Sequence, residues 1–122
     1  MTAWVWVLVA VCGAAGAVGR FAVAQALAAR TSATFPLGTF VVNSVGAFLA
    51  GSAAGAHLDG AVRVVLVGGF LGAFTTFSTW MVEAHRVGHA HHRRATVVYV
   101  GTTLVVGTVA AGVGWFLAAL LS

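Results

Sequence analysis

Charged residues are scarce in this sequence. Of 122 residues, six are basic, all of them arginine, and only two are acidic. Charged residues make up 7% of the chain, whereas a soluble domain carries about 25%. Hydrophobic residues make up 61%, and the mean hydropathy is +1.04. So few charges cannot coat a water-exposed surface, which excludes a soluble domain and indicates a membrane protein.

Cysteine and proline each occur once. The single Cys12 excludes an internal disulfide, and its apolar flanks favour a small packing residue over a reactive thiol. Pro36 stands at the start of an apolar run, where a helix tolerates proline. The apolar residues 1–19 lack the basic start and the cleavage signal of a secretory leader, so we expect a retained helix.

Four apolar runs are each long enough to cross a bilayer, which needs about 20 residues. They cover approximately residues 3–27, 37–56, 62–82 and 95–121. The links are short, so consecutive helices should be antiparallel neighbours. The sequence therefore predicts an all-α membrane protein with one four-span domain over residues 1–122. A domain of this size cannot enclose a wide pore alone, so we expect an oligomer.

The arginines are distributed unequally between the two sides of the membrane. Four spans place both termini and the 57–61 link on one side, where Arg63 is partly offset by Asp59. The other side carries four arginines: Arg30, Arg86, Arg93 and Arg94. Because positive charge stays cytoplasmic, we predict one orientation, with both termini outside and the 86–94 link in the cytoplasm.

Residues 72–79 combine glycine and hydroxyl residues inside the third run and predict a break in its helix. In lipid, irregular backbone survives only inside protein or beside a wet cavity. Broken transporter helices use their free carbonyl oxygens to hold Na⁺, a hard cation that suits such ligands. Phe74, Phe77 and Trp80 lie on one drifting helix face. They are either plain core or the lining of a pore, in which ring edges contact an anion.

Polar residues inside the spans each allow two interpretations. Arg20 is either an anion attractor at a pore mouth or a snorkelling anchor. Asn43 either donates to an anion or joins helices. Tyr99 and Thr103, with Thr102 beside them, form a polar track or bond back to their own helix. No span offers a nucleophile–base pair or a phosphate-binding loop, so an enzyme is not expected.

Four histidines precede the last span. They are His85, His89, His91 and His92. Their clustering is similar to a loop metal site, but Glu83 is the only carboxylate nearby. We therefore favour a solvated loop, and the role of the cluster, if it has one, stays open.

The stretch from Gly69 to Trp80, GFLGAFTTFSTW, resembles the Fluc (CrcB) fluoride-specific ion channel family. Support comes from Gly19-Arg20, from Gly38-Thr39 with Asn43, and from the length and four-span layout. The resemblance implies a fluoride-selective passive channel of the cell membrane that lets fluoride leave the cell and so relieves fluoride toxicity. It also implies an antiparallel, dual-topology-type dimer.

The resemblance further implies particular sites. A structural Na⁺ at the dimer centre, not transported, would be held by backbone carbonyls of Gly72 and Thr75. The fluoride pathway would fall on five residues: Asn43, Phe77, Trp80, Tyr99 and Thr103.

Trp80 departs from the family pattern, which usually has Phe at that position. The arginine bias also departs from what an equally inserting homodimer needs. We therefore hypothesise a heterodimer with an inverted Fluc-type subunit, while a homodimer stays open. The alternatives are a small dual-topology four-helix multidrug exporter and a non-conducting membrane assembly subunit. Such exporters rely on an intramembrane carboxylate, whereas Glu83 stands at the end of the third run.

Overall fold

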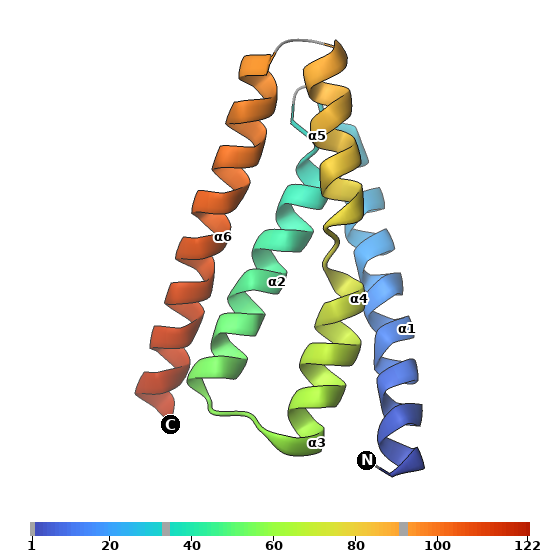
Figure 1. The fold of residues 1–122 in the computed structure, drawn as a ribbon, viewed down its shortest axis with the longest axis vertical. Coiled ribbons are helices and arrows are strands. Elements are labelled where there is room, and N and C mark those ends of the chain that lie inside the picture. The colour runs from blue at the N-terminus through green and yellow to red at the C-terminus, as the bar shows by residue number, and fades with distance from the viewer. Residues whose placement is uncertain (1, 33–34, 91–92) are drawn as a thin grey trace.

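The computed structural model describes residues 2–32, 35–90 and 93–122, and helices account for nearly all of them (Figure 1). The element order is α1 Ala3–Ala26, a 3₁₀ turn η1 Ala28–Arg30, α2 Leu37–Gly55, α3 Gly60–Arg63, a π-helix η2 Val64–Leu71, α4 Gly72–Phe74, α5 Ser78–Ala90 and α6 Arg93–Leu121. The described residues contain four helical segments that are long and apolar enough to cross a membrane. The predicted all-α, four-span fold is confirmed.

The first, second and fourth spans begin and end close to the predicted residues. Helix α1 has 24 residues, and at 1.5 Å per residue it is about 36 Å long, enough for a hydrocarbon core of about 30 Å. Helix α2 begins directly after Pro36, whose carbonyl accepts the Phe40 N–H at 3.2 Å. A backbone N–H at the start of a helix has no partner within the helix, so proline, which lacks an N–H, is tolerated there.

The third span differs from the prediction in length and in form. It is continuous from α3 through η2 into α4, it opens at residues 75–77, and it continues as α5 to Ala90. The predicted link 83–94 is therefore wrong for most of its length. His85 and His89 lie on a helix, whereas His91 and His92 fall outside the described residues. The break predicted within 72–79 is present but narrower, because Gly72 to Phe74 are still helical.

Helix α5 continues past the apolar run because one of its faces is buried. Ala84 and Val87 are 4% and 2% exposed, and α5 packs on α6 along this side. Thr96 adds a hydrogen bond from its hydroxyl to the Ala84 carbonyl at 3.0 Å. Burial against a neighbouring helix thus sustains a segment whose other face carries histidine and arginine.

The helices pack as two pairs along their length. Helix α2 packs along α6, and α1 packs along η2 and α4. Small residues permit this approach, since a Cβ on Gly51 would overlap the Ala111 carbonyl and one on Gly16 would overlap the Phe70 carbonyl. Figure 1 shows both termini and the α2–α3 turn at one end, as four antiparallel spans require.

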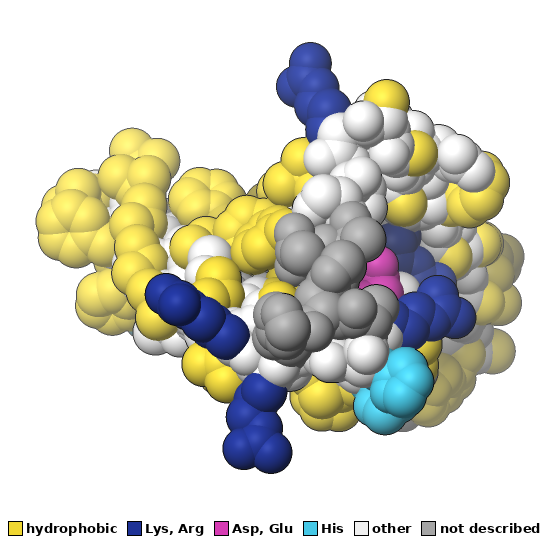
Figure 2. Space-filling model, turned by 90° about the horizontal axis from the view of Figure 1, so that it is seen from above, with side chains coloured by type: hydrophobic (Ala, Val, Ile, Leu, Met, Phe, Trp, Pro, Cys, Tyr) yellow, Lys and Arg dark blue, Asp and Glu magenta, His cyan; other side chains and the backbone are white. Residues whose placement is uncertain are grey.

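The arginine-rich links lie at the opposite end. Figure 2 views that end and shows arginine side chains projecting around it. Most large apolar side chains along the spans are exposed in the single chain, for example Trp4, Phe21 and Leu121. Surfaces of this kind are covered by lipid or by another membrane subunit.

Candidate functional site

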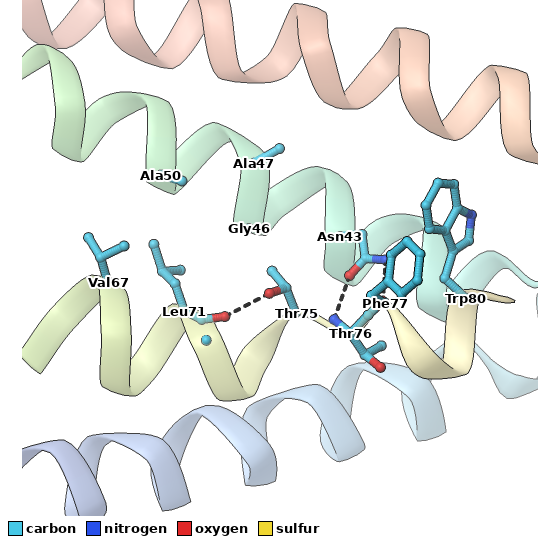
Figure 3. A pocket seen from close by; sticks show the side chains of 11 residues that line it. Asn43, Gly46, Ala47, Ala50, Val67, Leu71, Thr75, Thr76, Phe77 and Trp80 are labelled. Carbon is cyan, nitrogen blue, oxygen red and sulfur yellow. Dashed lines mark hydrogen bonds between the residues drawn. The ribbon is translucent and has the colours of Figure 1, made fainter. Parts of the chain in front are cut away.

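The third span opens immediately after α4. Thr75 has extended backbone angles, φ −86° and ψ 160°, and α5 begins three residues later at Ser78. Both the N–H and the hydroxyl of Thr75 donate to the Leu71 carbonyl, each at 2.9 Å (Figure 3). Thr75 alone therefore supplies both hydrogen bonds to the Leu71 carbonyl in the last helical turn before the opening.

The opening leaves backbone carbonyls without helical partners. In a continuous helix the Thr76 N–H would donate to the Gly72 carbonyl. Here the Thr76 N–H donates to the Asn43 side chain instead. Among the described residues, no hydrogen bond reaches the carbonyl oxygens of Gly72 or Thr75. These two oxygens are therefore free to accept another ligand.

Asn43 on α2 supplies the partners that the opened backbone needs. Its Nδ2 donates to the Thr76 carbonyl at 2.8 Å, and its Oδ1 accepts the Thr76 N–H at 2.9 Å. Figure 3 shows the amide turned toward the opening. Unpaired backbone groups are costly in a bilayer, so this side chain makes the irregular segment tolerable. Asn43 thus joins α2 to the open segment of the third span, and its role as a donor to an anion stays a prediction.

A groove borders the opening on the side of α2. Figure 3 shows it lined by Asn43, Thr75, Thr76, Phe77 and Trp80, with further small and aliphatic side chains along α2 and η2. Gly46 is required here, because a Cβ on it would overlap the Thr75 methyl group. A second pocket contains Arg20 together with Thr39, Thr76 and Thr79. Thr76 lines both hollows. The opening therefore lies between the pocket that contains the Arg20 guanidinium and the groove that contains Phe77 and Trp80.

Phe77 and Trp80 form an edge-to-face pair at the end of the groove. Their ring centroids lie 5.7 Å apart and the rings are inclined by 75°. Phe77 is 70% exposed in the single chain, whereas Trp80 is 9% exposed. Ring edges carry partial positive charge, so a polarisable or anionic group in the groove meets them favourably. Phe74, the third predicted aromatic, is buried and stacks on Phe70 at 5.7 Å.

Trp80 of this pair and the neighbouring Tyr99 each carry a buried donor that has no acceptor among the described residues. Trp80 and Tyr99 belong to one core cluster with Ala84. Within the described part of the chain, neither Trp80 Nε1 nor Tyr99 Oη has a hydrogen-bond partner. A buried unpaired donor costs about 1–3 kcal/mol, so two in one cluster call for an explanation. A small anion or a water between helices would satisfy them.

Thr103 bonds to its own helix. Its hydroxyl donates to the Tyr99 carbonyl at 2.7 Å, and its side chain is 6% exposed. This is the back-bonding alternative for the α6 hydroxyls. Of the Thr103 and Tyr99 hydroxyls, only that of Tyr99 is therefore without an acceptor among the described residues.

One further contact joins α2 to α5. The Thr39 hydroxyl donates to Glu83 Oε1, and both groups are partly buried. Glu83 lies inside α5 rather than at the end of a span. The sequence contains no signal for this pairing or for the pairing of Asn43 with Thr76, since both depend on how two separate helices are placed.

Comparison with known proteins identifies close relatives. A family model described as CrcB-like protein, camphor resistance (CrcB), matches residues 7–115. The chain is 44% identical over 120 residues to a fluoride-specific ion channel FluC 2 of Mycolicibacterium paratuberculosis, covering 98% of each chain. It is 43% identical over 115 residues to a fluoride-specific ion channel FluC 1 of Symbiobacterium thermophilum, covering 89% of this chain and 93% of the relative.

Proposed function

This chain belongs to the CrcB family, and from that membership we propose that it is a fluoride-selective ion channel of the cell membrane. The observation that carries the assignment is the 44% identity over nearly the whole chain to a relative named for this activity. Four membrane-spanning helices suit a multi-pass channel. The chain is a channel subunit and not an enzyme.

We propose that fluoride passes the opening in the third span. The Arg20 pocket would attract the anion, and the ring edges of Phe77 and Trp80 would contact it beyond Thr76. A narrow path lined by donors and ring edges selects an anion without a fixed counter-charge in the path itself. The unpaired donors of Trp80 and Tyr99 support this route, because fluoride is a strong hydrogen-bond acceptor. Thr103 would take part only after its hydroxyl leaves the Tyr99 carbonyl.

Passive movement separates this function from that of a proton-coupled exporter. Fluoride efflux from proteoliposomes that contain the chain together with an inverted Fluc-type subunit, followed with a fluoride electrode, should continue when a protonophore abolishes the proton gradient. A multidrug exporter would instead stop when the gradient is lost, and a non-conducting assembly subunit would release no fluoride in either condition.

We further propose that Gly72 and Thr75 hold a structural Na⁺ that is not transported. Their carbonyl oxygens accept no hydrogen bond from the described residues, and hard oxygen ligands suit this cation. Gly72 is exposed, so a second subunit could approach it and contribute its own carbonyls. A bound Na⁺ would offset the partial negative charge of converging oxygens and hold two subunits together.

Removal of Na⁺ tests this site. Exchange of Na⁺ for N-methyl-D-glucamine should lower both the melting temperature and the fluoride flux, and added Na⁺ should restore both. A ligand at one hundred times its Kd stabilises a fold by about 2.7 kcal/mol. Equal melting temperature and equal flux in the two salts would contradict the proposal.

The partner is proposed to be a second Fluc-type subunit in the inverted orientation, in an antiparallel dimer. The arginine-rich end of this chain favours one orientation, so a different relative that inserts in the opposite orientation would supply the other half. The existence of relatives named FluC 1 and FluC 2 fits such pairs. A homodimer is the alternative.

The orientation of the chain expressed alone distinguishes these assemblies. Labelling of tags at the two termini should show them on the outside only, and the lone chain should conduct little fluoride. Equal labelling on both sides, together with full fluoride conductance, would establish the homodimer.

A further inference from the structure

The end of α5 carries two histidines on one face. His85 and His89 are four residues apart, so their side chains project from the same side of the helix. Their imidazole rings are nearly parallel, inclined by 17°, with centroids 6.0 Å apart. Both side chains are exposed, and Figure 2 shows histidine surface open at this end of the molecule. The ring nitrogens take part in no hydrogen bond or ion pair of the described residues.

We propose that His85 and His89 chelate a divalent transition-metal ion such as Zn²⁺, Ni²⁺ or Cu²⁺. Two histidines at i and i+4 on a helix are the arrangement with which helical zinc motifs bind their metal. Neutral imidazole is a ligand for these borderline ions and not for Mg²⁺ or Ca²⁺. With two protein ligands, the remaining coordination positions would belong to water.

The charged residues near His85 and His89 in the sequence determine how strongly this site would bind a metal ion. The nearest carboxylate in sequence, Glu83, accepts the Thr39 hydroxyl, so it is engaged toward α2. Arg86 lies between the two histidines in sequence, and Arg93 and Arg94 begin α6. These positive charges oppose a dication, so the site binds reversibly and does not act as a permanent structural centre. Within the described ranges no third His, Cys, Asp or Glu joins these two histidines, so the protein would supply only two ligands.

Metal binding would join two successive turns of α5. Only the helical conformation brings both rings to one ion, so bound metal stabilises this helix end through linkage. The same helix carries Trp80 and Glu83 nearer the opening of the third span. The site is separate from the fluoride pathway, and its test does not depend on conduction.

The test uses the full chain in detergent with His91 and His92 both replaced by glutamine, which removes the other two histidines of the sequence cluster. Isothermal titration with ZnCl₂ should give one ion per chain. His85→Gln and His89→Gln should each weaken binding about tenfold or more, since loss of a group that merely orients a metal ligand costs about 10–100-fold. Each single variant should retain only the weak binding of one imidazole, and the double variant should bind no Zn²⁺ at this site. His57→Gln, at the other end of the molecule, is the matched control and should bind normally.

Two results would overturn the proposal. One is additive loss, in which each single variant retains half of the bound Zn²⁺ with its affinity unchanged, as two independent imidazoles would. The other is disappearance of binding in the background that lacks His91 and His92. Both histidines are exposed on α5, so metal-free melting temperatures should be equal across the series and exclude misfolding as the cause.

Discussion

Replacement of Asn43 by leucine is expected to lower fluoride flux by about tenfold or more. Leucine is similar in size but cannot pair with the Thr76 N–H and carbonyl, which Asn43 holds at 2.9 and 2.8 Å. Interhelical hydrogen bonds in membranes average only about 0.6 kcal/mol. The Thr76 N–H and carbonyl lie outside any helix, however. Leaving each of them unpaired therefore costs about 1–3 kcal/mol. A barrier change of about 1.4 kcal/mol is tenfold in rate.

Ser44→Ala is the matched control for this variant. Ser44 is the next residue of α2, and its buried hydroxyl has no partner within the described structure. Its removal should leave both flux and melting temperature unchanged or slightly raised. If Asn43→Leu conducts as well as Ser44→Ala, Asn43 does not support the pathway.

Replacement of Phe77 by leucine is expected to reduce fluoride flux about tenfold or more without unfolding the subunit. Phe77 is 70% exposed, so little of the packing in one chain depends on it. Leucine fills similar space but has no ring edge with partial positive charge. Loss of about 1.4 kcal/mol of stabilisation at the barrier accounts for this decrease. Flux is measured with a fluoride electrode, and melting temperature is measured in parallel.

One control variant and one comparison variant distinguish the effect of the Phe77 ring from that of its neighbours. Phe116 on α6 is 56% exposed and lines neither the groove nor the Arg20 pocket, so Phe116→Leu should leave flux unchanged. Trp80→Phe retains a ring beside Phe77 and removes the unpaired Nε1–H. That variant should still conduct, with a flux lowered by the loss of one donor, and should melt at a higher temperature. Equal flux in Phe77→Leu and Phe116→Leu would show that Phe77 does not line the path.

Hydropathy was sufficient to predict three of the four spans. Helices α1, α2 and α6 are predominantly apolar, and their ends fall where proline, arginine or short polar links interrupt the runs. The opening of the third span was predictable from glycine and hydroxyl residues, because such residues neither require nor strongly favour a continuous helix. Its narrow extent was not predictable, since it depends on where Asn43 meets Thr76.

The end of α5 was mispredicted because hydropathy falls after residue 82 while burial does not. Trp80, Ala84 and Val87 are buried on one face, and their spacing of four and three residues is that of a helix. This pattern could have extended the predicted helix past His85. The π-helix η2 has no such signal, and neither has the contact of Thr39 with Glu83. Both arise from packing between distant segments of the chain.

The most direct test of the central claim is selectivity between fluoride and chloride. Proteoliposomes containing the purified subunit, alone and together with the inverted subunit of the same cell, are loaded with both potassium salts and opened to ion flow with valinomycin. We predict that fluoride leaves and chloride stays in at least one preparation. Release of chloride at a similar rate, or retention of fluoride in both preparations, would contradict a fluoride-selective path through the opening at Thr75.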